Sequence, residues 1–89
     1  YKMGVTIKRP DNASVAAANI YLYDGADGTG NLLEQWTNQS IDLFGTDGLN
    51  ISKSGLTVSS GSLKIEWIDS NGNVIGNPQI VSSFNFKEE

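Results

Sequence analysis

The aromatic residues of one short segment carry the clearest chemical possibility in this sequence. Tyr21 and Tyr23 alternate with Ile20 and Leu22, and a β-strand places alternate residues on opposite faces. If the aliphatic pair faces a core, the tyrosines face outward, about 7 Å apart at a rise of roughly 3.4 Å per residue. That spacing suits neighbouring rings of a sugar chain or a contact with another domain, and Trp36 is a third candidate. The alternative is that these rings are ordinary half-buried residues of a sheet.

The acidic residues of the stretch 24–31 could form a cation site. An EF-hand loop has oxygen ligands at positions one, three and five and a glycine at position six. Counted from Asp27, the sixth position is Leu32, so the spacing of an EF-hand fails. A looser loop site through Asp24, Asp27 and Asn31 is the remaining weak candidate for a metal. Its alternative is a loop shaped by aspartate and glycine alone.

Catalytic chemistry has few residues available to it. The sequence contains neither histidine nor cysteine. It therefore lacks the usual general base near neutral pH, the commonest metal ligand and any thiol nucleophile. Its aspartates and glutamates lie mostly in turns or at the C-terminus, where solvent surrounds them. We therefore expect no enzyme activity and no cofactor.

Composition narrows the possible partners and location. The net charge is −4, and the six basic residues are scattered along 89 residues, so no basic patch predicts nucleic-acid binding. No apolar run is long enough to insert into a membrane. The absence of cysteine fits either a cytosolic protein or a bacterial or viral surface protein, and the high content of Asn, Ser, Thr and Gly favours an extracellular, cell-surface or virion location. A length of 89 residues predicts one domain, residues 1–89. Because the chain begins at Tyr1, we expect this domain to be excised from a longer protein, the alternative being a mature product.

One hairpin is expected to organise the sheet that positions these residues. Leu63, Ile65 and Trp67 alternate with charged residues, which predicts a strand with one buried face. Asn71-Gly72 follows between two apolar runs and predicts a tight hairpin turn of type I′. Trp67 is therefore expected in the core.

Other short strands are expected along the whole chain. They cover residues 3–7, 20–23, 32–37, 49–51, 56–58 and 79–87. Strand 32–37 is two-faced, which indicates either a sheet edge or partial burial on both sides, and 41–44 is a short apolar piece. With seven or eight short strands, the fold class is all-β, a small antiparallel β-sandwich of Greek-key, immunoglobulin-like or transthyretin-like type. In the last strand Ile80, Ser82, Phe84 and Phe86 are expected to share one face. The predicted core is Val5, Ile7, Ile20, Leu22, Leu63, Ile65, Trp67, Phe84 and Phe86.

Two segments near the N-terminus resemble a known family. GVTIKRPD at 4–11 and VAAANIYLYD at 15–24 resemble the start of a Cna-B or transthyretin-like repeat: a strand, a polar turn, then a strand ending in Leu-Tyr-Asp. Immunoglobulin-like domains of bacterial and phage surface proteins have the same sequence features. The resemblance implies a β-sandwich module of such a surface protein.

That resemblance also implies a possible cross-link. Many Cna-B domains form a Lys–Asn isopeptide bond promoted by a buried acid, and the corresponding residues would be Lys8, Asn85 and Glu66. Alternation places Glu66 opposite the face of Trp67, and Asn85 away from its neighbouring phenylalanines. We therefore expect no cross-link.

A second resemblance covers residues 48–65. Gly48-Leu49-Asn50-Ile51 is followed seven residues later by Gly55-Leu56-Thr57-Val58, which is similar to the shaft repeats of trimeric viral fibres. The alternative is two short strands that share turn glycines. We favour that alternative, because the rest of the chain contains no such repeat.

These observations favour a non-catalytic structural or interaction module of a larger extracellular or virion surface protein. It would act as a spacer, a decoration domain or an assembly domain. Its expected partners are neighbouring domains of the same polypeptide or further copies of the chain. The alternative is a carbohydrate-binding module that uses Tyr21, Tyr23 and Trp36, with a glycan as partner.

Overall fold

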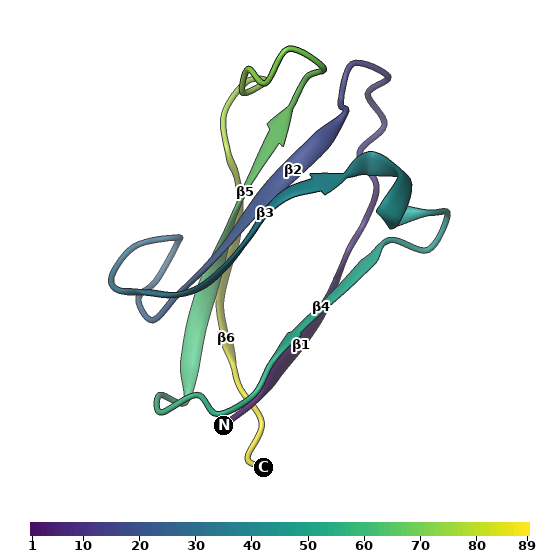
Figure 1. The fold of residues 1–89 in the computed structure, drawn as a ribbon. Coiled ribbons are helices and arrows are strands. Elements are labelled where there is room, and N and C mark those ends of the chain that lie inside the picture. The colour runs from purple at the N-terminus through teal and green to yellow at the C-terminus, as the bar shows by residue number, and fades with distance from the viewer.

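The computed structural model describes all of residues 1–89 and shows an antiparallel β-sandwich of two packed sheets (Figure 1). The strands are β1 (Met3–Ile7), β2 (Ala17–Tyr23), β3 (Leu32–Ser40), β4 (Leu49–Lys53), β5 (Ser60–Ile68) and β6 (Gln79–Asn85), with a 3-10 turn η1 (Ile41–Phe44). One sheet has the order β3-β2-β5-β6 and the other pairs β1 with β4. The predicted all-β fold class is confirmed, with six strands in place of seven or eight. No helix could cross a membrane.

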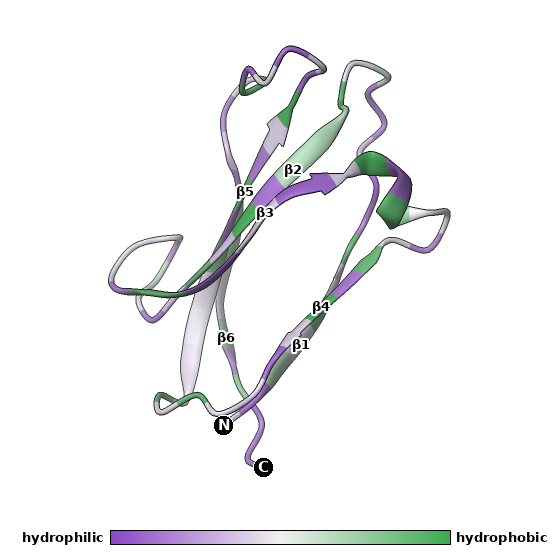
Figure 2. Cartoon of the chain, viewed as in Figure 1, coloured by the Kyte–Doolittle hydropathy of each residue, from purple (hydrophilic) through white to green (hydrophobic).

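The core lies between the two sheets, and alternation decides which side chains enter it. Seven of the nine residues of the predicted core belong to the buried hydrophobic cluster, and the other two, Val5 and Phe84, are partly buried and pack against it. The other buried members of the cluster are Met3, Val15, Ala18, Phe44, Ile51 and Leu56. Figure 2 shows the resulting alternation of hydrophobic and hydrophilic residues along β4, and a largely hydrophobic η1.

The turn after β5 is not of the predicted type. Gly72 N–H donates to Asp69 O at 3.0 Å, and Asp69 N–H donates to Asn73 O at 2.9 Å. Gly72 has a positive φ of 85°, whereas Asn71 does not, so the turn is type I followed by a left-handed glycine. The Asp69 carboxylate accepts hydrogen bonds from the N–H groups of Asn71 and Asn73, both at 2.9 Å. This side chain fixes the loop, so the chain reverses without the I′ geometry. The apolar run Val74-Ile75 forms no second strand and pairs with β5 through a single bridge between Ile68 and Val74.

An extra residue in β6 overturns the predicted common face of its side chains. Phe84 lies opposite Gly61 and Val81 lies opposite Leu63, so three steps along β6 match two along β5. Val81 therefore packs toward the core. Ile80 lies opposite Lys64 on the outer face and is 43% exposed. The prediction that Ile80 shares a face with Phe84 and Phe86 is wrong.

The predicted strand 56–58 is also wrong, because this segment forms bends. Leu56 is nevertheless buried, and it pairs with Tyr1 through two main-chain hydrogen bonds of 2.7 and 2.8 Å. The two glycine-led repeats at 48–51 and 55–58 thus adopt different structures, one a strand and the other not.

The two sheets are joined differently at their two sides. On one side, Lys2 and Lys87 exchange two main-chain hydrogen bonds of 2.8 Å, which brings both termini together (Figure 1). On the other side, Lys53 of β4 forms a 3.2 Å ion pair with Glu34 of β3. β3 is an edge strand, which is one of the two arrangements that its two-faced pattern indicated. The bridge between Lys2 and Lys87, just beyond the ends of β1 and β6, is therefore the one main-chain pairing that joins the two sheets.

Candidate functional site

The outer face of the four-stranded sheet carries a group of polar and aromatic residues, here called the outer aromatic cluster: Tyr21, Tyr23, Lys64 and Glu66. Tyr21 and Tyr23 are half-buried and lie opposite the core-facing Ile20 and Leu22, as predicted. Their ring centroids are 6.5 Å apart, with planes inclined by 37°. Tyr21 pairs with Lys64 across the β2–β5 ladder, which brings these side chains together.

The side chains of the cluster contact one another through cation–π interactions and a hydrogen bond. The ammonium group of Lys64 lies 5.2 Å from the ring centroid of Tyr21 and 5.7 Å from that of Tyr23, within the range of a cation–π contact. The Tyr21 hydroxyl donates to Glu66 Oε1 at 3.1 Å, and Asn19 Nδ2 donates to the same oxygen at 3.5 Å. Burial, and then the hydrogen bond and charge of Glu66, raise the pKa of Tyr21 above its ordinary value. Glu66 Oε1 thus accepts hydrogen bonds from Asn19 and Tyr21, and the phenol of Tyr21 is held in its neutral form.

Trp36 does not join the two tyrosines. It lies opposite Ile20 in the β2–β3 ladder, on the inner face, and packs against the core. Gln35 is the residue opposite Tyr21 on the outer face. The three aromatic residues predicted to bind a ligand are therefore divided between the two faces of the sheet.

The loop 24–31 is closed by the side chains expected to bind a metal. Asp24 Oδ1 accepts a hydrogen bond from Asn31 N–H at 2.7 Å, and Asp24 Oδ2 accepts one from Asn31 Nδ2 at 3.0 Å. These bonds lower the pKa of Asp24. Asp27 is exposed, has a positive φ of 54°, and bonds to neither residue. No group of three or more acidic side chains is placed to hold a metal ion.

Ser62, which is not among the candidate residues predicted from the sequence, fixes the same loop to the sheet. Its hydroxyl accepts a hydrogen bond from Gly28 N–H and donates one to Gly25 O, both at 2.7 Å. Ser62 is fully buried and is the one buried polar side chain of the domain. A serine within an apolar strand, between Gly61 and Leu63, is the sequence signal that could have identified it.

The three residues considered for an isopeptide bond lie apart. Glu66 is on the outer face, as alternation predicted, and is engaged by Tyr21. Lys8 follows the end of β1, beside Gln79 at the start of β6. Asn85 lies at the other end of β6, opposite Ser60.

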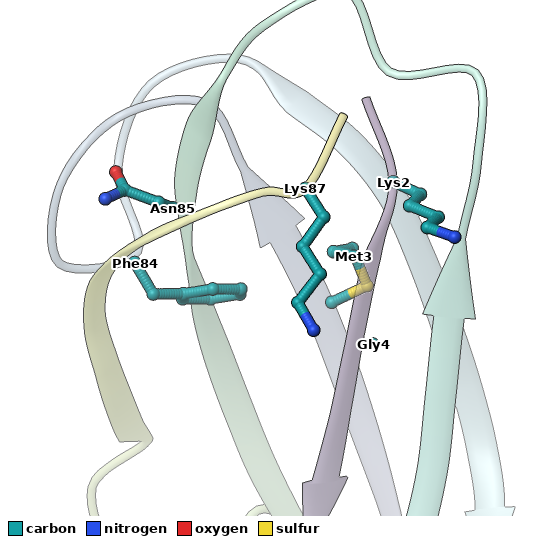
Figure 3. A pocket seen from close by; sticks show the side chains of 6 residues that line it. All are labelled: Lys2, Met3, Gly4, Phe84, Asn85 and Lys87. Carbon is teal, nitrogen blue, oxygen red and sulfur yellow. The ribbon is translucent and has the colours of Figure 1, made fainter. Parts of the chain in front are cut away.

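A groove between β1 and β6 is the main concave feature, and sequence reasoning missed it. Near the termini it holds a cavity of about 260 Å³, lined by Lys2, Met3, Gly4, Phe84, Asn85 and Lys87 (Figure 3). Farther along is a cavity of about 430 Å³, whose apolar lining residues are Val5, Ile7, Leu63, Ile65 and Val81. We call the two cavities together the β1–β6 groove. In Figure 3 the Phe84 ring and Met3 point into it, Lys87 extends between them, and Lys2 and Asn85 point away.

The long sides of this groove are strand edges without partners. β1 pairs only with β4, and β6 pairs only with β5, apart from the single bridge between Lys2 and Lys87. Beyond that bridge β1 and β6 diverge (Figure 1). The groove therefore combines apolar side chains with unpaired main-chain donors and acceptors, which is the chemistry of a strand-binding site.

Comparison of the chain with protein-family models, with curated proteins and with solved structures returns no match.

Proposed function

We propose that the chain is a non-catalytic structural and interaction module of a larger extracellular or virion surface protein. It contacts neighbouring domains, or further copies of itself, through open strand edges. The observation that carries this proposal is the β1–β6 groove, where two strand edges of one sandwich lie near each other without pairing. Unpaired edges are the parts of a sheet that bind other strands.

The distribution of hydrogen bonds supports the same proposal. No buried side-chain nitrogen or oxygen lacks a partner. Glu66 is engaged by Tyr21, and Asp24 is engaged by Asn31. The buried polar side-chain atoms, together with the carboxylates of Glu66 and Asp24, are thus bonded within the domain, whereas main-chain groups along the groove are not.

The location outside the cell rests on composition and resemblance. The cysteine-free chain is rich in Asn, Ser, Thr and Gly. Its N-terminal segments resemble Cna-B, transthyretin-like or immunoglobulin-like modules of bacterial and phage surfaces. A β-sandwich with adjacent termini is compatible with insertion between other domains as a spacer or decoration.

A carbohydrate-binding module is the second candidate, and the pair Tyr21 and Tyr23 favours it. Their rings are 6.5 Å apart on an accessible face, a separation that adjacent sugar rings could match. Two observations weigh against it: Lys64 lies over both rings, and Trp36 packs on the inner face.

A glycan array combined with light scattering separates the two candidates. The proteins are the wild type, the double variant Tyr21→Ala/Tyr23→Ala, and the control Tyr21→Phe/Tyr23→Phe, which keeps both rings. The proposed function predicts no glycan signal and a molecular mass that increases with protein concentration. A monomer without a glycan signal would restrict the contacts to other domains of the polypeptide. A glycan signal that the alanine variant loses and the phenylalanine variant keeps would overturn the proposal in favour of sugar binding.

A further inference from the structure

We propose that the β1–β6 groove accepts an extended segment of another polypeptide, which inserts as an additional strand between β1 and β6. The segment alternates apolar with polar residues and carries carboxylates at its ends. This inference rests on the proposed function, because it names the contact through which an interaction module would bind.

The main chain of β1 presents unpaired groups to the groove. In a strand, the N–H and C=O of one residue point to one side and those of the next residue to the other. Tyr1 bonds to Leu56 on the β4 side, and Lys2 bonds to Lys87 on the β6 side. By this alternation, the main-chain groups of Gly4 and Thr6 point toward β6. The ladder to β4 leaves them without partners.

The main chain of β6 presents the matching edge. Phe86 N–H donates to Ser59 O on the β5 side, and Lys87 bonds to Lys2 on the β1 side. The main-chain groups of Asn85 therefore also point toward β1. A direct ladder would continue from the Lys2–Lys87 pair to Gly4 and Asn85, yet no such pair forms. Instead a cavity of about 260 Å³ lies between these two residues.

The apolar residues at the floor of the groove favour apolar side chains at alternate positions of the inserted strand. Val5, Leu63, Ile65 and Val81 line its wider part, and Phe84 lines the part near the termini. Val5, Val81 and Phe84 are each only partly buried in the isolated domain. Every second residue of an inserted strand would face this floor and bury it, so an apolar residue is favoured at those positions.

The basic residues at the border of the groove favour acidic residues at the two ends of the inserted segment. Lys8 lies at the wide end of the groove and Lys2 and Lys87 at the narrow end. Three of the six basic residues of the chain thus border the groove, of which Lys2 points its side chain away from it (Figure 3), and no carboxylate lines it. Glu89 is turned elsewhere, toward the amino group of Tyr1 and the N–H of Gly55. A segment with acidic ends complements this border in a chain whose net charge is otherwise negative.

The geometry also sets the length of the segment and limits how it can pair. β1 has five residues, so a segment of about five residues spans the groove. At the Lys2–Lys87 bridge β1 and β6 are antiparallel to each other. A strand between them must therefore run parallel to one and antiparallel to the other.

Synthetic peptides test the inference on the whole domain. The probe peptide alternates valine and threonine over five positions and carries two glutamates at each end. One control peptide has the same composition with its valines grouped together, and a second replaces the glutamates by lysines. A third has the probe sequence with alternate main-chain nitrogens methylated. Binding is followed by amide chemical shifts and by hydrogen exchange, with peptide concentrations up to about 1 mM.

The expected result is that the probe peptide binds and slows exchange of the Gly4 and Thr6 amides about tenfold or more. The grouped, lysine-flanked and methylated peptides should bind at least about fivefold more weakly, since each lacks one recognised feature. Failure of the probe to bind would overturn the inference. Binding that leaves the exchange of Gly4 and Thr6 unchanged would overturn it too, because the peptide would then be bound elsewhere.

A matched pair of variants at Gly4 isolates the main-chain contact. Gly4→Pro removes the N–H that faces the groove and leaves the ladder to β4 in place, whereas Gly4→Ala keeps the N–H and adds a methyl group into open space. Gly4→Pro should weaken the probe about fivefold to tenfold relative to Gly4→Ala. Equal binding by both variants would overturn the inference, and the methylated peptide provides the same test on wild type if the proline variant does not fold.

Failure of this inference can be distinguished from failure of the proposed function. If the probe does not bind but the wild type self-associates in light scattering, the module interacts through another edge, such as that of β3. If instead a glycan signal depends on the rings of Tyr21 and Tyr23, the proposed function itself fails.

Discussion

The ring of Phe44 lies against the indole of Trp67, with their centroids 5.6 Å apart and their planes inclined by 55°. Phe44 comes from η1 and is 1% exposed, and Trp67 comes from β5 and is 8% exposed. The indole N–H donates to Gln79 Oε1 at 3.2 Å, so the polar edge of Trp67 is satisfied. This tilted aromatic contact joins the short turn after β3 to the central strand of the sheet.

Replacing Trp67 by alanine should therefore be costly. We expect Trp67→Ala to lower the free energy of unfolding by about 3–5 kcal/mol, a large part of the roughly 5–15 kcal/mol typical of a domain. Chemical denaturation measures this loss. A loss below about 1 kcal/mol would mean that Trp67 is not a core residue. Leu43→Ala, at an exposed position of η1, is the control and should change stability by about 0.5 kcal/mol or less.

Trp67 could be predicted from the sequence because its neighbours alternate regularly and a turn signal follows. Phe44 could not, although it is more deeply buried. The segment Ile41–Phe44 has neither period two nor a full helical period, and a 3-10 turn of this length gains its burial only from the sheets that it covers. Local patterns thus identified the strands, whereas tertiary contacts decided the role of η1.

Alternation failed where a strand contains an irregularity. The extra residue in β6 places Val81 inside and Ile80 outside, and nothing in the polar pair Ser82-Ser83 marks that position in the sequence. The type of the turn was missed for a similar reason. Asn71-Gly72 permits type I′, but the carboxylate of Asp69 stabilises a different loop.

The candidate sites also differ in whether a local sequence pattern or the tertiary structure determines them. Tyr21 and Tyr23 were correctly placed on the outer face, because that depends on a single strand. The β1–β6 groove depends on where two strands diverge, and these strands lie at opposite ends of the chain. No local pattern encodes that divergence.

Removing the hydroxyl of Ser62 should free the loop 24–31. Ser62→Ala leaves Gly28 N–H and Gly25 O without their partner inside the sheet, and we expect a loss of about 1–3 kcal/mol. Hydrogen exchange of the Gly28 amide should become faster in the variant. Ser59→Ala, at an exposed position before β5, is the control. Unchanged exchange at Gly28 would contradict the assigned role of Ser62.

The closure of this loop by Asp24 should depend on pH. Its pKa lies below the ordinary value of 3.8, first because Asn31 Nδ2 donates a hydrogen bond and next because Asn31 N–H donates another. A lowered pKa in the folded state gives a stabilisation that is present above the unfolded value and is lost as the pH falls through the folded pKa. Asn31→Ala should raise the pKa of Asp24 and leave it below 3.8, because the main-chain donor remains.

Carbon-13 NMR of the Asp24 carboxyl group measures this titration. Adding calcium to the same sample tests the weak metal candidates. Coupled shifts of Asp24, Asp27 and Asn31 would support a loop site for the cation. An Asp24 pKa that does not respond to Asn31→Ala would show that the two side chains do not bond in solution.

The phenol of Tyr21 should resist ionisation. Burial raises its pKa above the ordinary value of 10.0, and the hydrogen bond to Glu66 and the charge of that carboxylate raise it further. A proton is therefore held more tightly in the folded state than in the unfolded state. The resulting stabilisation is fully present below the unfolded pKa of about 10, and it is lost as the pH rises through the folded pKa.

Glu66→Gln removes the charge but preserves burial, so it should lower the pKa of Tyr21 toward 10.0 without reaching it. Carbon-13 NMR of the tyrosine ring measures the titration directly. Glu34→Gln, which changes a carboxylate paired with Lys53 at the edge of the sandwich, is the matched control and should leave Tyr21 unaffected. Tyr21→Phe should flatten the fall of stability with pH above about 10, because the group that releases its proton on unfolding is then absent. A Tyr21 pKa at or below the ordinary value in the wild type would mean that the bond to Glu66 is not formed, and the outer aromatic cluster would then be open to a ligand.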